Sequence, residues 1–499
     1  MSKSKIALLL ALVLIIAGGL RLYHLKQLPQ GLYPDEAMNG NNALEALNNG
    51  AFGGKVFYPE NNGREGLFMN IQAGFLATTG LREPWVMRLP SALFGILTVL
   101  GMYFLGRELF SKRVGLLASF LLATSFWHIN FSRIGFRAIM APFFLVWALY
   151  FFLLALHRYL SDEKKTFSFF CAAIGGIVFG LGFYSYIAYR VSPLLFLLLV
   201  PFFLKNKGFW KLAATFVLFT ILIALPIGIY YLKNPADFLG RTSQVSVMSS
   251  ASPIKDLGLN ILKTAAMFNF RGDGNWRHNF AGRPELFWPV GILLWIGIIL
   301  AVRALWKKFR RGEDHGNAMP SVIIFGWLIL AALPVVVSNE GIPHALRSIL
   351  LIPPVILLAG WGGIFAYDKI QKLLSFSSST LRLKKMFAAF AWVVLALLVL
   401  EAATTYFILW GKNPNVQGAF AADQVELGRK LEALPADIPK YVVVKAGGTD
   451  VRGYPMPTQT VMFITDTFRP EMQKVKNIYY VLPKDEGNIP AGALKFYIQ

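Results

Sequence analysis

Residues Gly31–Ala46 read GLYPDEAMNGNNALEA and follow the first long apolar run of the chain, Ile6–Leu22. Two adjacent acids in this stretch, Asp35 and Glu36, stand directly after Pro34, where the pattern predicts the start of a helix. Carboxylates close to a bilayer surface are costly unless they are solvated, paired or used in chemistry. We therefore expect the rest of the chain to be a scaffold that holds this stretch against a membrane.

The composition is that of a membrane protein. The chain has 499 residues, of which 55% are hydrophobic and only 15% are charged, whereas an average soluble protein carries about 25% charged residues. Apolar runs of about 17–25 residues, long enough to cross a bilayer, recur along it, and a closed barrel would instead need short alternating strands. We predict a polytopic α-helical membrane protein with about 11 spans, at 6–23, 84–105, 114–131, 139–157, 168–187, 191–204, 210–231, 286–303, 321–338, 348–366 and 387–409.

The net charge of +22 is compatible with nucleic-acid binding, but many of the basic residues lie in short segments between the predicted spans. Lys and Arg in such loops set topology and meet anionic lipid, so we expect membrane lipids and no nucleic acid among the partners. The same bias predicts a multi-pass protein of the cell (inner) membrane with a cytoplasmic N-terminus and an extracytoplasmic C-terminus. The single cysteine, Cys171, excludes an internal disulfide.

Three predicted extracytoplasmic segments are long. Residues 24–83 hold the acidic pair. Residues 232–285 are polar and rich in Gly, Asn and Arg, and such a loop could act as a lid near a substrate entrance. Residues 411–499 change composition, so we expect a small extracytoplasmic α/β domain after a membrane domain of residues 1–410. The expected elements of the first and last segments are helices over 37–47, 65–78 and 418–434 and strands over 441–445, 460–465 and 477–482.

The acidic pair has two interpretations. Asp35 could cap a helix by accepting a hydrogen bond from a backbone N–H two or three residues on, although Met38 occupies the position where a capping box would need Glu or Gln. Alternatively, the pair supplies a general base that faces a membrane-embedded cavity. The two interpretations are compatible, and Asp35 and Glu36 are the candidate catalytic residues.

Arg64 and Glu65, in NGREGLFMNIQAG, could form a surface ion pair worth about 0–1 kcal/mol. Alternatively, Arg64 meets an anion and Glu65 orients it or binds a metal, so a divalent metal is a conceivable cofactor and no other is indicated. Arg137 lies four residues after Arg133 in SFWHINFSRIGFRAIMAP. Two arginines at this spacing could anchor the chain at the interface or hold a phosphate.

Further candidates border two spans on the same predicted outer side. Tyr189 and Arg190, in GFYSYIAYRVSP, could belong to an aromatic belt or contact substrate. His344 and Arg347, in EGIPHALRSILLIPP, can share one helix face, as an interface anchor or as part of an anion site. The sequence has no zinc-spaced His/Cys cluster, P-loop or Gly-rich dinucleotide fingerprint, so nucleotide chemistry has no support.

Several motifs occur together: PDE after the first span, REGLF in the first outer loop, EPWVMRLPSALFGILTVLGMYFLGRELF, SFWHINFSRIGFRA and HALRSILLIPP. Together they resemble the GT-C membrane glycosyltransferases, especially glycosyltransferase family 39 and its bacterial relatives, a group that includes the protein O-mannosyltransferases and the lipid A aminoarabinose transferases. The likeness covers residues 1 to about 410. It implies a GT-C fold and an enzyme that passes a sugar from a polyprenyl-phosphate carrier to an acceptor outside the membrane.

The resemblance also implies roles for single residues. Asp35 matches the family's catalytic aspartate, with Glu36 as its usual neighbour. Glu65 looks like an acid that some relatives place beside the carrier phosphate or a metal, and Arg347 matches an arginine thought to meet that phosphate. The loop after the third span, HINFSRIGFRA, lacks the second acid of some relatives, which disfavours a metal-bridged site of the oligosaccharyltransferase type. The expected substrate- and phosphate-binding set is Arg64, Glu65, Arg137, Tyr189, Arg190, His344 and Arg347.

The chemistry agrees with a glycosyltransferase that uses one base. A phosphate leaving group is already a stable anion, so it needs arginines rather than a second carboxyl group acting as an acid. We expect a single displacement with inversion, in which Asp35 deprotonates a hydroxyl of a protein, lipid or glycan acceptor. Alternatives are a polyprenyl-linked oligosaccharide ligase or oligosaccharyltransferase and, in another class, a transporter or lipid flippase. Transporters usually carry charges near the bilayer midplane, whereas here the charges gather in outer loops.

Overall fold

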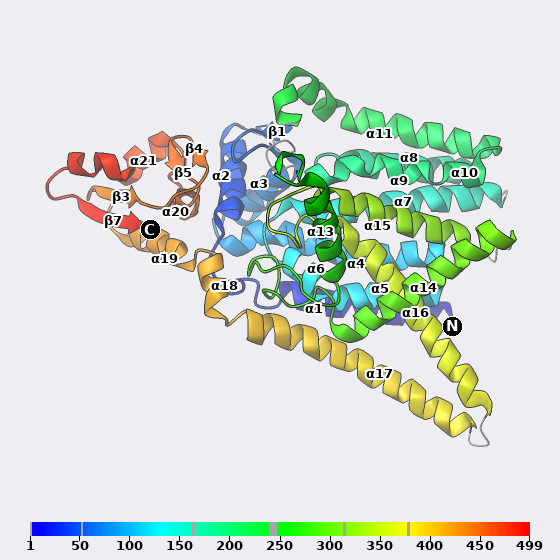
Figure 1. Ribbon diagram of the computed structural model, residues 1–499. Helices are drawn as coiled ribbons and strands as arrows, with labels where there is room; N and C mark the ends of the chain where they lie inside the picture. The colour runs from blue at the N-terminus through cyan, green and yellow to red at the C-terminus, as the bar shows by residue number, and fades with distance from the viewer. Residues whose placement is uncertain (1, 51–52, 162–164, 239–246, 313–315, 377–379) are drawn as a thin grey trace.

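The computed structural model describes the chain except for residues 1, 51–52, 162–164, 239–246, 313–315 and 377–379. A bundle of long helices forms the body, and a small α/β domain stands at one end of it (Figure 1). Nine helices in the described part are long and apolar enough to cross a bilayer, so the chain is a multi-pass membrane protein. They are α1 (Lys3–Leu22), α4 (Pro84–Leu109), α7 (Met140–Leu160), α8 (Lys165–Gly182), α11 (Lys207–Lys233), α14 (Trp288–Arg311), α15 (Ala318–Val336), α16 (Ile352–Leu373) and α17 (Thr380–Thr404).

Two of the predicted spans, 114–131 and 191–204, are series of shorter helices. In the first, Ser125 is extended and its hydroxyl accepts a hydrogen bond from the N–H of His128, so a new helix begins there. In the second, proline residues cannot donate the backbone hydrogen bonds of a continuous helix. The pieces are α5 (Lys112–Thr124), α6 (Phe126–Phe131), η2 (Ile187–Val191), α9 (Pro193–Leu197) and α10 (Val200–Phe203).

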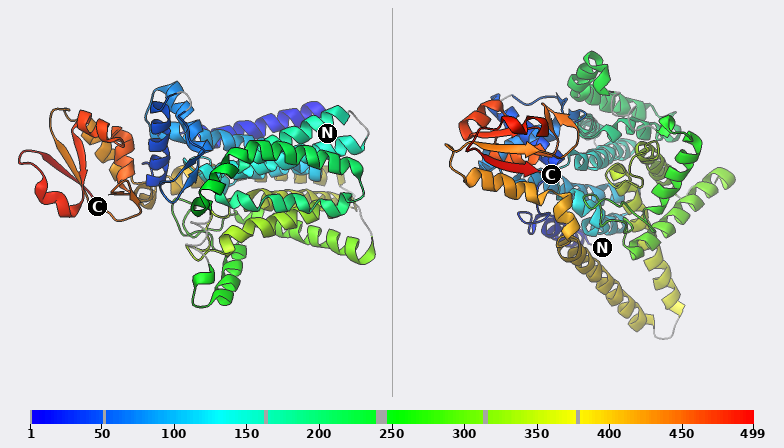
Figure 2. Two further views of the ribbon diagram at one scale, coloured as in Figure 1. Left: turned by 90° about the horizontal axis from the view of Figure 1, so that it is seen from above. Right: turned by 60° about the vertical axis from the view of Figure 1, so that its left-hand side comes forward.

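Burial differs strongly among the spans. The apolar windows of α7 and α16 are 83% and 78% buried inside the protein, whereas that of α17, which continues as a π-helix to Trp410, is 11% buried. Figure 2 shows α17 running along the outside of the bundle. Helices α4 and α5 approach closely at Gly115, where a Cβ would lie 2.4 Å from the carbonyl oxygen of Tyr103. The centre of the bundle is therefore tightly packed, and α17 is left to contact lipid.

The connection between α1 and α4 covers the end of the bundle that faces the α/β domain (Figure 1). It folds into helix α2, an antiparallel hairpin of β1 and β2, and helix α3, which confirms the two helices predicted here. The segment predicted as a lid contains helix α13 and an ordered stretch before α14, and its function as a lid stays a prediction. The bounds are α2 (Pro34–Asn48), β1 (Phe57–Tyr58), β2 (Arg64–Glu65), α3 (Leu67–Thr79) and α13 (Pro253–Ala266).

The C-terminal part is a small α/β domain, as predicted. A parallel sheet in the order β6-β3-β7 contains the predicted strands near 441 and 478. The predicted strand 460–465 is wrong, because these residues belong to helix α20, all of whose residues are buried, and a short apolar run buried on every side has no diagnostic period. The elements are α18 (Pro414–Ala419), α19 (Ala422–Ala433), β3 (Lys440–Val444), β4 (Asp450–Val451), β5 (Tyr454–Pro455), α20 (Thr458–Thr465), α21 (Pro470–Lys476), β6 (Ile478–Val481) and β7 (Leu494–Ile498).

Candidate functional site

The acidic pair lies in the first turn of α2. Tyr33 is the N-cap and Pro34 is the first helical residue. The Tyr33 N–H donates to Glu36 Oε2 at 3.3 Å, so Glu36, rather than the predicted Asp35, closes the cap. Because successive helical residues are about 100° apart around the axis, the two carboxylates face different surroundings.

Glu36 is fully buried and paired with Arg88 of α4, at 2.9 Å between Oε1 and Nε and 3.0 Å between Oε2 and Nη2. The Gly135 N–H donates to Oε1 at 2.5 Å. Arg88 also donates to the carbonyls of Pro29 and Gly31. Both carboxylate oxygens of Glu36 are thus occupied inside the packed interior, and the predicted catalytic role for Glu36 has no support in this geometry. Arg88 was missed from the sequence, although a charge in an apolar span signals a buried partner.

Asp35 instead lines a small pocket, with a cavity volume of about 90 Å³, that opens to solvent. The side-chain amide of Asn61 donates to Asp35 Oδ1. Burial, and next the charge on Asp35, raise the pKa of Tyr33, so that phenol stays protonated beside the carboxylate. Among the described residues of the lining Asp35 is the one acid: the lining consists of Asp35, Asn39, Asn61, Arg64, Phe136, Arg137, Ala138, Tyr186, Ile187 and Leu346.

Arg64 and Arg137 bring positive charge to this pocket. Arg64 donates to the side-chain oxygens of Asn39, at 2.6 Å, and of Asn42. Burial, and next the charge on Arg137, lower the pKa of Arg64 to about 10, which leaves it charged at neutral pH. Neither of its two amide partners carries a charge, so no direct ion pair among the described contacts neutralises the positive charge of Arg64.

Glu65 lies between two arginines rather than beside a metal. Its Oε2 is 3.0 Å from Arg137 Nε and its Oε1 is 3.6 Å from Arg190 Nη2. The hydroxyl of Tyr231 is 3.5 Å from Oε1. Two guanidinium groups on one carboxylate repel a divalent cation, so the metal role considered for Glu65 is unfavourable here. Glu65 holds Arg137 at the pocket wall, whereas Arg190 contacts Glu65 and is not part of the pocket lining.

Tyr189 does not reach the pocket. It is fully buried and packs against Phe179 and Phe183, with ring centroids 5.4 and 5.5 Å away. A Cβ at Gly182 would collide with its ring, which shows how closely the two helical segments approach there. Tyr186 is the tyrosine that lines the pocket, and its ring lies 5.8 Å below the guanidinium of Arg137. Tyr186, rather than the predicted Tyr189, is therefore the tyrosine at the pocket.

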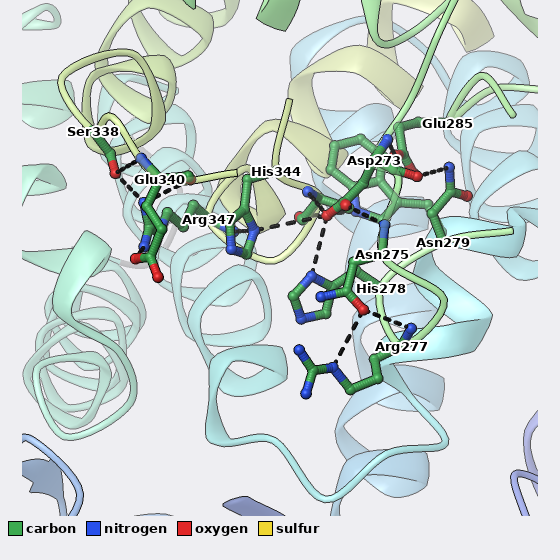
Figure 3. Close-up of polar contacts among 12 residues, drawn as sticks. Asp273, Asn275, Arg277, His278, Asn279, Glu285, Ser338, Glu340, His344 and Arg347 are labelled. Carbon is green, nitrogen blue, oxygen red and sulfur yellow. Dashed lines mark hydrogen bonds and ion pairs between the residues drawn. The ribbon is translucent and has the colours of Figure 1, made fainter. Parts of the chain in front are cut away.

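Arg347 is engaged by Ser338 and Glu340 (Figure 3). Its Nη2 is 2.5 Å from Glu340 Oε2, and its Nη1 donates to Ser338 Oγ and to the Glu340 carbonyl. The neighbouring Leu346, not Arg347, is part of the lining of the Asp35 pocket. The structure therefore does not bring the predicted phosphate ligand Arg347 to Asp35.

His344 belongs to a cluster that the sequence did not reveal. One ligand atom from each of Asp273, His278 and His344 lies within 4.8 Å of the others. The Asp273 Oδ2 is 3.1 Å from His278 Nδ1 and 3.8 Å from His344 Nδ1, and the imidazole rings stack at 4.8 Å (Figure 3). The separation between Asp273 and His344 in the sequence hides the cluster, because neither half has the spacing of a metal motif.

This cluster has the donor types of a divalent metal site, one carboxylate and two imidazoles. Backbone N–H groups of Asn275 and Ala345 donate to Asp273 at 2.8 Å each and fix its orientation. Burial, and next the charge of His278, lower the pKa of His344 to about 3. His344 is thus neutral at physiological pH, as a ligand must be.

The stretch before α14, which carries Asp273 and His278 of this cluster, also contacts the start of α2. The guanidinium of Arg277 lies 3.9 Å from the centroid of the Tyr33 ring. The carbonyl of Arg277 accepts a hydrogen bond from Asn130 at 2.7 Å. The stretch before α14 is therefore packed against the start of α2 and against α6.

The comparisons with known proteins agree with this architecture. A family described as dolichyl-phosphate-mannose-protein mannosyltransferase matches residues 67–230. A comparison with curated protein sequences gives no match. The oligosaccharyltransferase of Archaeoglobus fulgidus in the apo form is 15% identical, with a TM-score of 0.58 over 98% of this chain and 67% of that one. The chain thus spans about two thirds of the length of the archaeal enzyme.

Two further solved structures carry a lipid phosphate. ArnT from Cupriavidus metallidurans bound to undecaprenyl phosphate is 15% identical, with a TM-score of 0.55 over 96% of this chain and 90% of that one. AglB from Archaeoglobus fulgidus, in complex with an inhibitory peptide and a dolichol-phosphate, is 15% identical, with a TM-score of 0.56 over 93% of this chain and 64% of that one. The predicted GT-C fold is therefore confirmed.

Proposed function

We propose, from the fold that this chain shares with the GT-C membrane glycosyltransferases, that it transfers a sugar from a polyprenyl-phosphate-linked donor to an extracytoplasmic hydroxyl. The observation that carries the proposal is that one carboxylate, Asp35, and two arginines, Arg64 and Arg137, line the same pocket. A phosphate leaving group needs cations and an acceptor hydroxyl needs a base, and this pocket offers both. The lipid phosphates bound by ArnT and AglB support this donor class.

The proposed reaction is a single displacement. Asp35 takes the proton of the acceptor hydroxyl while that oxygen forms a bond to the anomeric carbon of the sugar. The bond between the anomeric carbon and the phosphate oxygen breaks at the same time, and its electron pair leaves with the polyprenyl phosphate. Attack from the face opposite the leaving group inverts the anomeric centre. Arg64 and Arg137 stabilise the charge that grows on the leaving phosphate.

The groups behind the pocket wall have positioning roles in this proposal. Glu36 and Arg88 fix the first turn of α2, from which Asp35 projects. Glu65 orients Arg137, and Asn61 orients Asp35. Lys and Arg residues are concentrated in the connecting segments at the end of the bundle remote from the C-terminal domain. This distribution supports a cytoplasmic N-terminus and an extracytoplasmic pocket and C-terminal domain.

An oligosaccharyltransferase is the second candidate, favoured by the likeness to the archaeal enzyme. The pocket lining has a single acid in the described residues, which supports a base mechanism over a site with several carboxylates around a metal. A transporter is less well supported, since the charged groups of the pocket lie at one end of the bundle rather than near the middle of the spans. The donor and acceptor distinguish the candidates.

The test of the function is a donor panel in proteoliposomes. Radiolabelled sugars on polyprenyl phosphate and oligosaccharides on polyprenyl diphosphate are offered with protein, lipid and glycan acceptors. We expect label to leave one monophosphate-linked donor and to appear with inverted configuration in one acceptor. Transfer only from a diphosphate-linked oligosaccharide would favour the ligase, and label that crosses the bilayer without bond cleavage would favour the transporter.

A further inference from the structure

The C-terminal domain packs on the helix that carries Asp35. Met38 of α2 is fully buried in the same hydrophobic cluster as Leu431 and Val442 of that domain. At Gly40 the ring of Phe463 comes so close that a Cβ would lie 2.5 Å from it. The α2 helix therefore has the membrane bundle on one side and the C-terminal domain on the other (Figures 1 and 2).

Polar contacts fix the register of this packing. The amide of Asn41 donates to Gln459 Oε1 at 3.0 Å, and Thr460 Oγ1 donates to the Leu32 carbonyl at 2.9 Å. Asn41, Gln459 and Thr460 are buried. Breaking such bonds leaves polar groups unpaired, so α20 and α2 are joined in one arrangement.

One side chain of this domain reaches past α2 to the hairpin beside the pocket. Arg452, at the tip between β4 and β5, places Nη2 3.1 Å from both carboxylate oxygens of Glu45 on α2. The same nitrogen is 2.7 Å from Glu60 Oε1 in the β1–β2 turn. Burial raises the pKa of Glu60, but the hydrogen bond from Arg452, a backbone hydrogen bond and the charges of Arg452 and Arg64 together lower it overall. A single guanidinium therefore links the helix and the turn.

The turn that Arg452 holds is the turn that contacts the proposed base. Asn61 follows Glu60 and donates to Asp35 Oδ1. Asn61 and Asn62 both have positive φ, at 52° and 62°, in the left-handed region that side chains adopt at a cost. The Glu60 carbonyl also accepts a hydrogen bond from Arg64 Nε at 3.3 Å. Glu60 thus adjoins one pocket residue in sequence and bonds to another.

We infer that Arg452 is a positioning residue for the pocket, through which the C-terminal domain sets the Asn61–Asp35 contact. Its link to Glu45 and Glu60 holds the turn against α2, and the turn holds the Asp35 carboxylate. The C-terminal domain is then part of the catalytic apparatus without touching substrate. The kinetic part of this inference rests on the proposed glycosyltransferase activity, and the structural part does not.

The test compares Arg452→Gln with a matched control, Arg429→Gln. Arg429 also joins the C-terminal domain to the first outer segment, at 3.1 Å between Nη2 and Glu83 Oε2, and it does so away from the turn. For Arg452→Gln we expect kcat to fall roughly tenfold, as small misplacements of catalytic groups do, with donor KM within about twofold. Arg452→Lys should restore part of the rate, and Arg429→Gln should behave as wild type.

Hydrogen exchange in detergent supplies a measurement that needs no activity. In Arg452→Gln we expect faster exchange in residues 57–66, with β3, β6 and β7 unchanged. Glu60→Gln should have the same effect, and the double variant should be no worse than either single one, because the two residues act as one link.

The outcomes separate the two proposals. Faster exchange in the turn without transfer from any donor would leave the link established and the proposed function refuted. Unchanged exchange in the turn, or a loss of rate equal to that of Arg429→Gln, would overturn the link. Loss of protection throughout the C-terminal sheet in both Arg452→Gln and Glu60→Gln would also overturn it, since both side chains would then only maintain the fold.

Discussion

Asp35 and Glu36 are neighbours in sequence, but they belong to two different regions of the molecule. Glu36 lies in a closed junction where α2 meets α4, with Arg88 and the Gly135 N–H on its oxygens. Asp35 lies in an open pocket, where Asn61 and two arginines surround it without forming a closed ion pair with it in the described contacts. A carboxylate used for folding is thus paired and shielded from water, whereas one available for chemistry is oriented and accessible.

Breaking the ion pair between Glu36 and Arg88 should have the largest effect. Glu36→Gln leaves Arg88 buried without a counter-charge, and removing one partner of a buried pair costs about 3–5 kcal/mol. We expect a markedly lower midpoint of thermal unfolding in detergent. Asp35→Asn, the matched change in the pocket, should leave that midpoint within a few degrees of wild type. Equal destabilisation by both substitutions would remove the distinction between the two regions.

A second comparison sets Arg137, which lines the pocket, against Arg347, which does not. Arg137→Gln removes a cation from the pocket, and hydrogen bonds to charged groups contribute about 1.5–3 kcal/mol, so donor affinity should fall about 10- to 100-fold. Arg347→Gln should change it only slightly, because Arg347 is engaged by Glu340 and Ser338. Binding of a labelled polyprenyl phosphate to purified protein measures both variants. A larger loss of affinity in Arg347→Gln than in Arg137→Gln would show that Arg347, not Arg137, holds the phosphate.

The smallest expected effects concern two tyrosines. Tyr186→Ala removes the ring under Arg137, and an exposed cation–π contact of about 0.5–1 kcal/mol predicts a few-fold loss of donor affinity. Tyr189→Phe removes a buried hydroxyl that has no hydrogen-bond partner in the described part of the chain. It should leave transfer unchanged and leave stability equal or slightly higher. Loss of transfer in Tyr189→Phe would show that the Tyr189 hydroxyl takes part in the reaction after all.

Much of the membrane fold follows from the sequence, because a span is recognised by the length of its apolar run. The exceptions have local causes. Ser125 interrupts a run with a polar cap that hydrophobicity does not register. The sequence of helix α20 shows no helical period, because packing against α2 and α19 buries all of its faces, so the pattern also fits a strand.

The candidate site is predictable where charged residues gather in the outer segments next to the spans. Asp35, Arg64 and Glu65 lie in the first outer loop, and Arg137 lies in the loop after the third predicted span. Contacts between distant segments are not predictable in this way, and the pairs Arg88–Glu36 and Asp273–His344 are examples. Tyr189 and Tyr186 could not be distinguished, because which tyrosine faces the pocket depends on the turn at η2.

In the proposed reaction Asp35 acts as the base and serves neither the fold nor the binding of the donor. The most direct measurement is sugar transfer by wild type and Asp35→Asn in proteoliposomes, together with donor binding by the same two proteins. We expect transfer to fall by at least about 100-fold, in the range of general-base catalysis, with donor binding within about threefold. Transfer by Asp35→Asn at a rate near that of wild type would rule out Asp35 as the base.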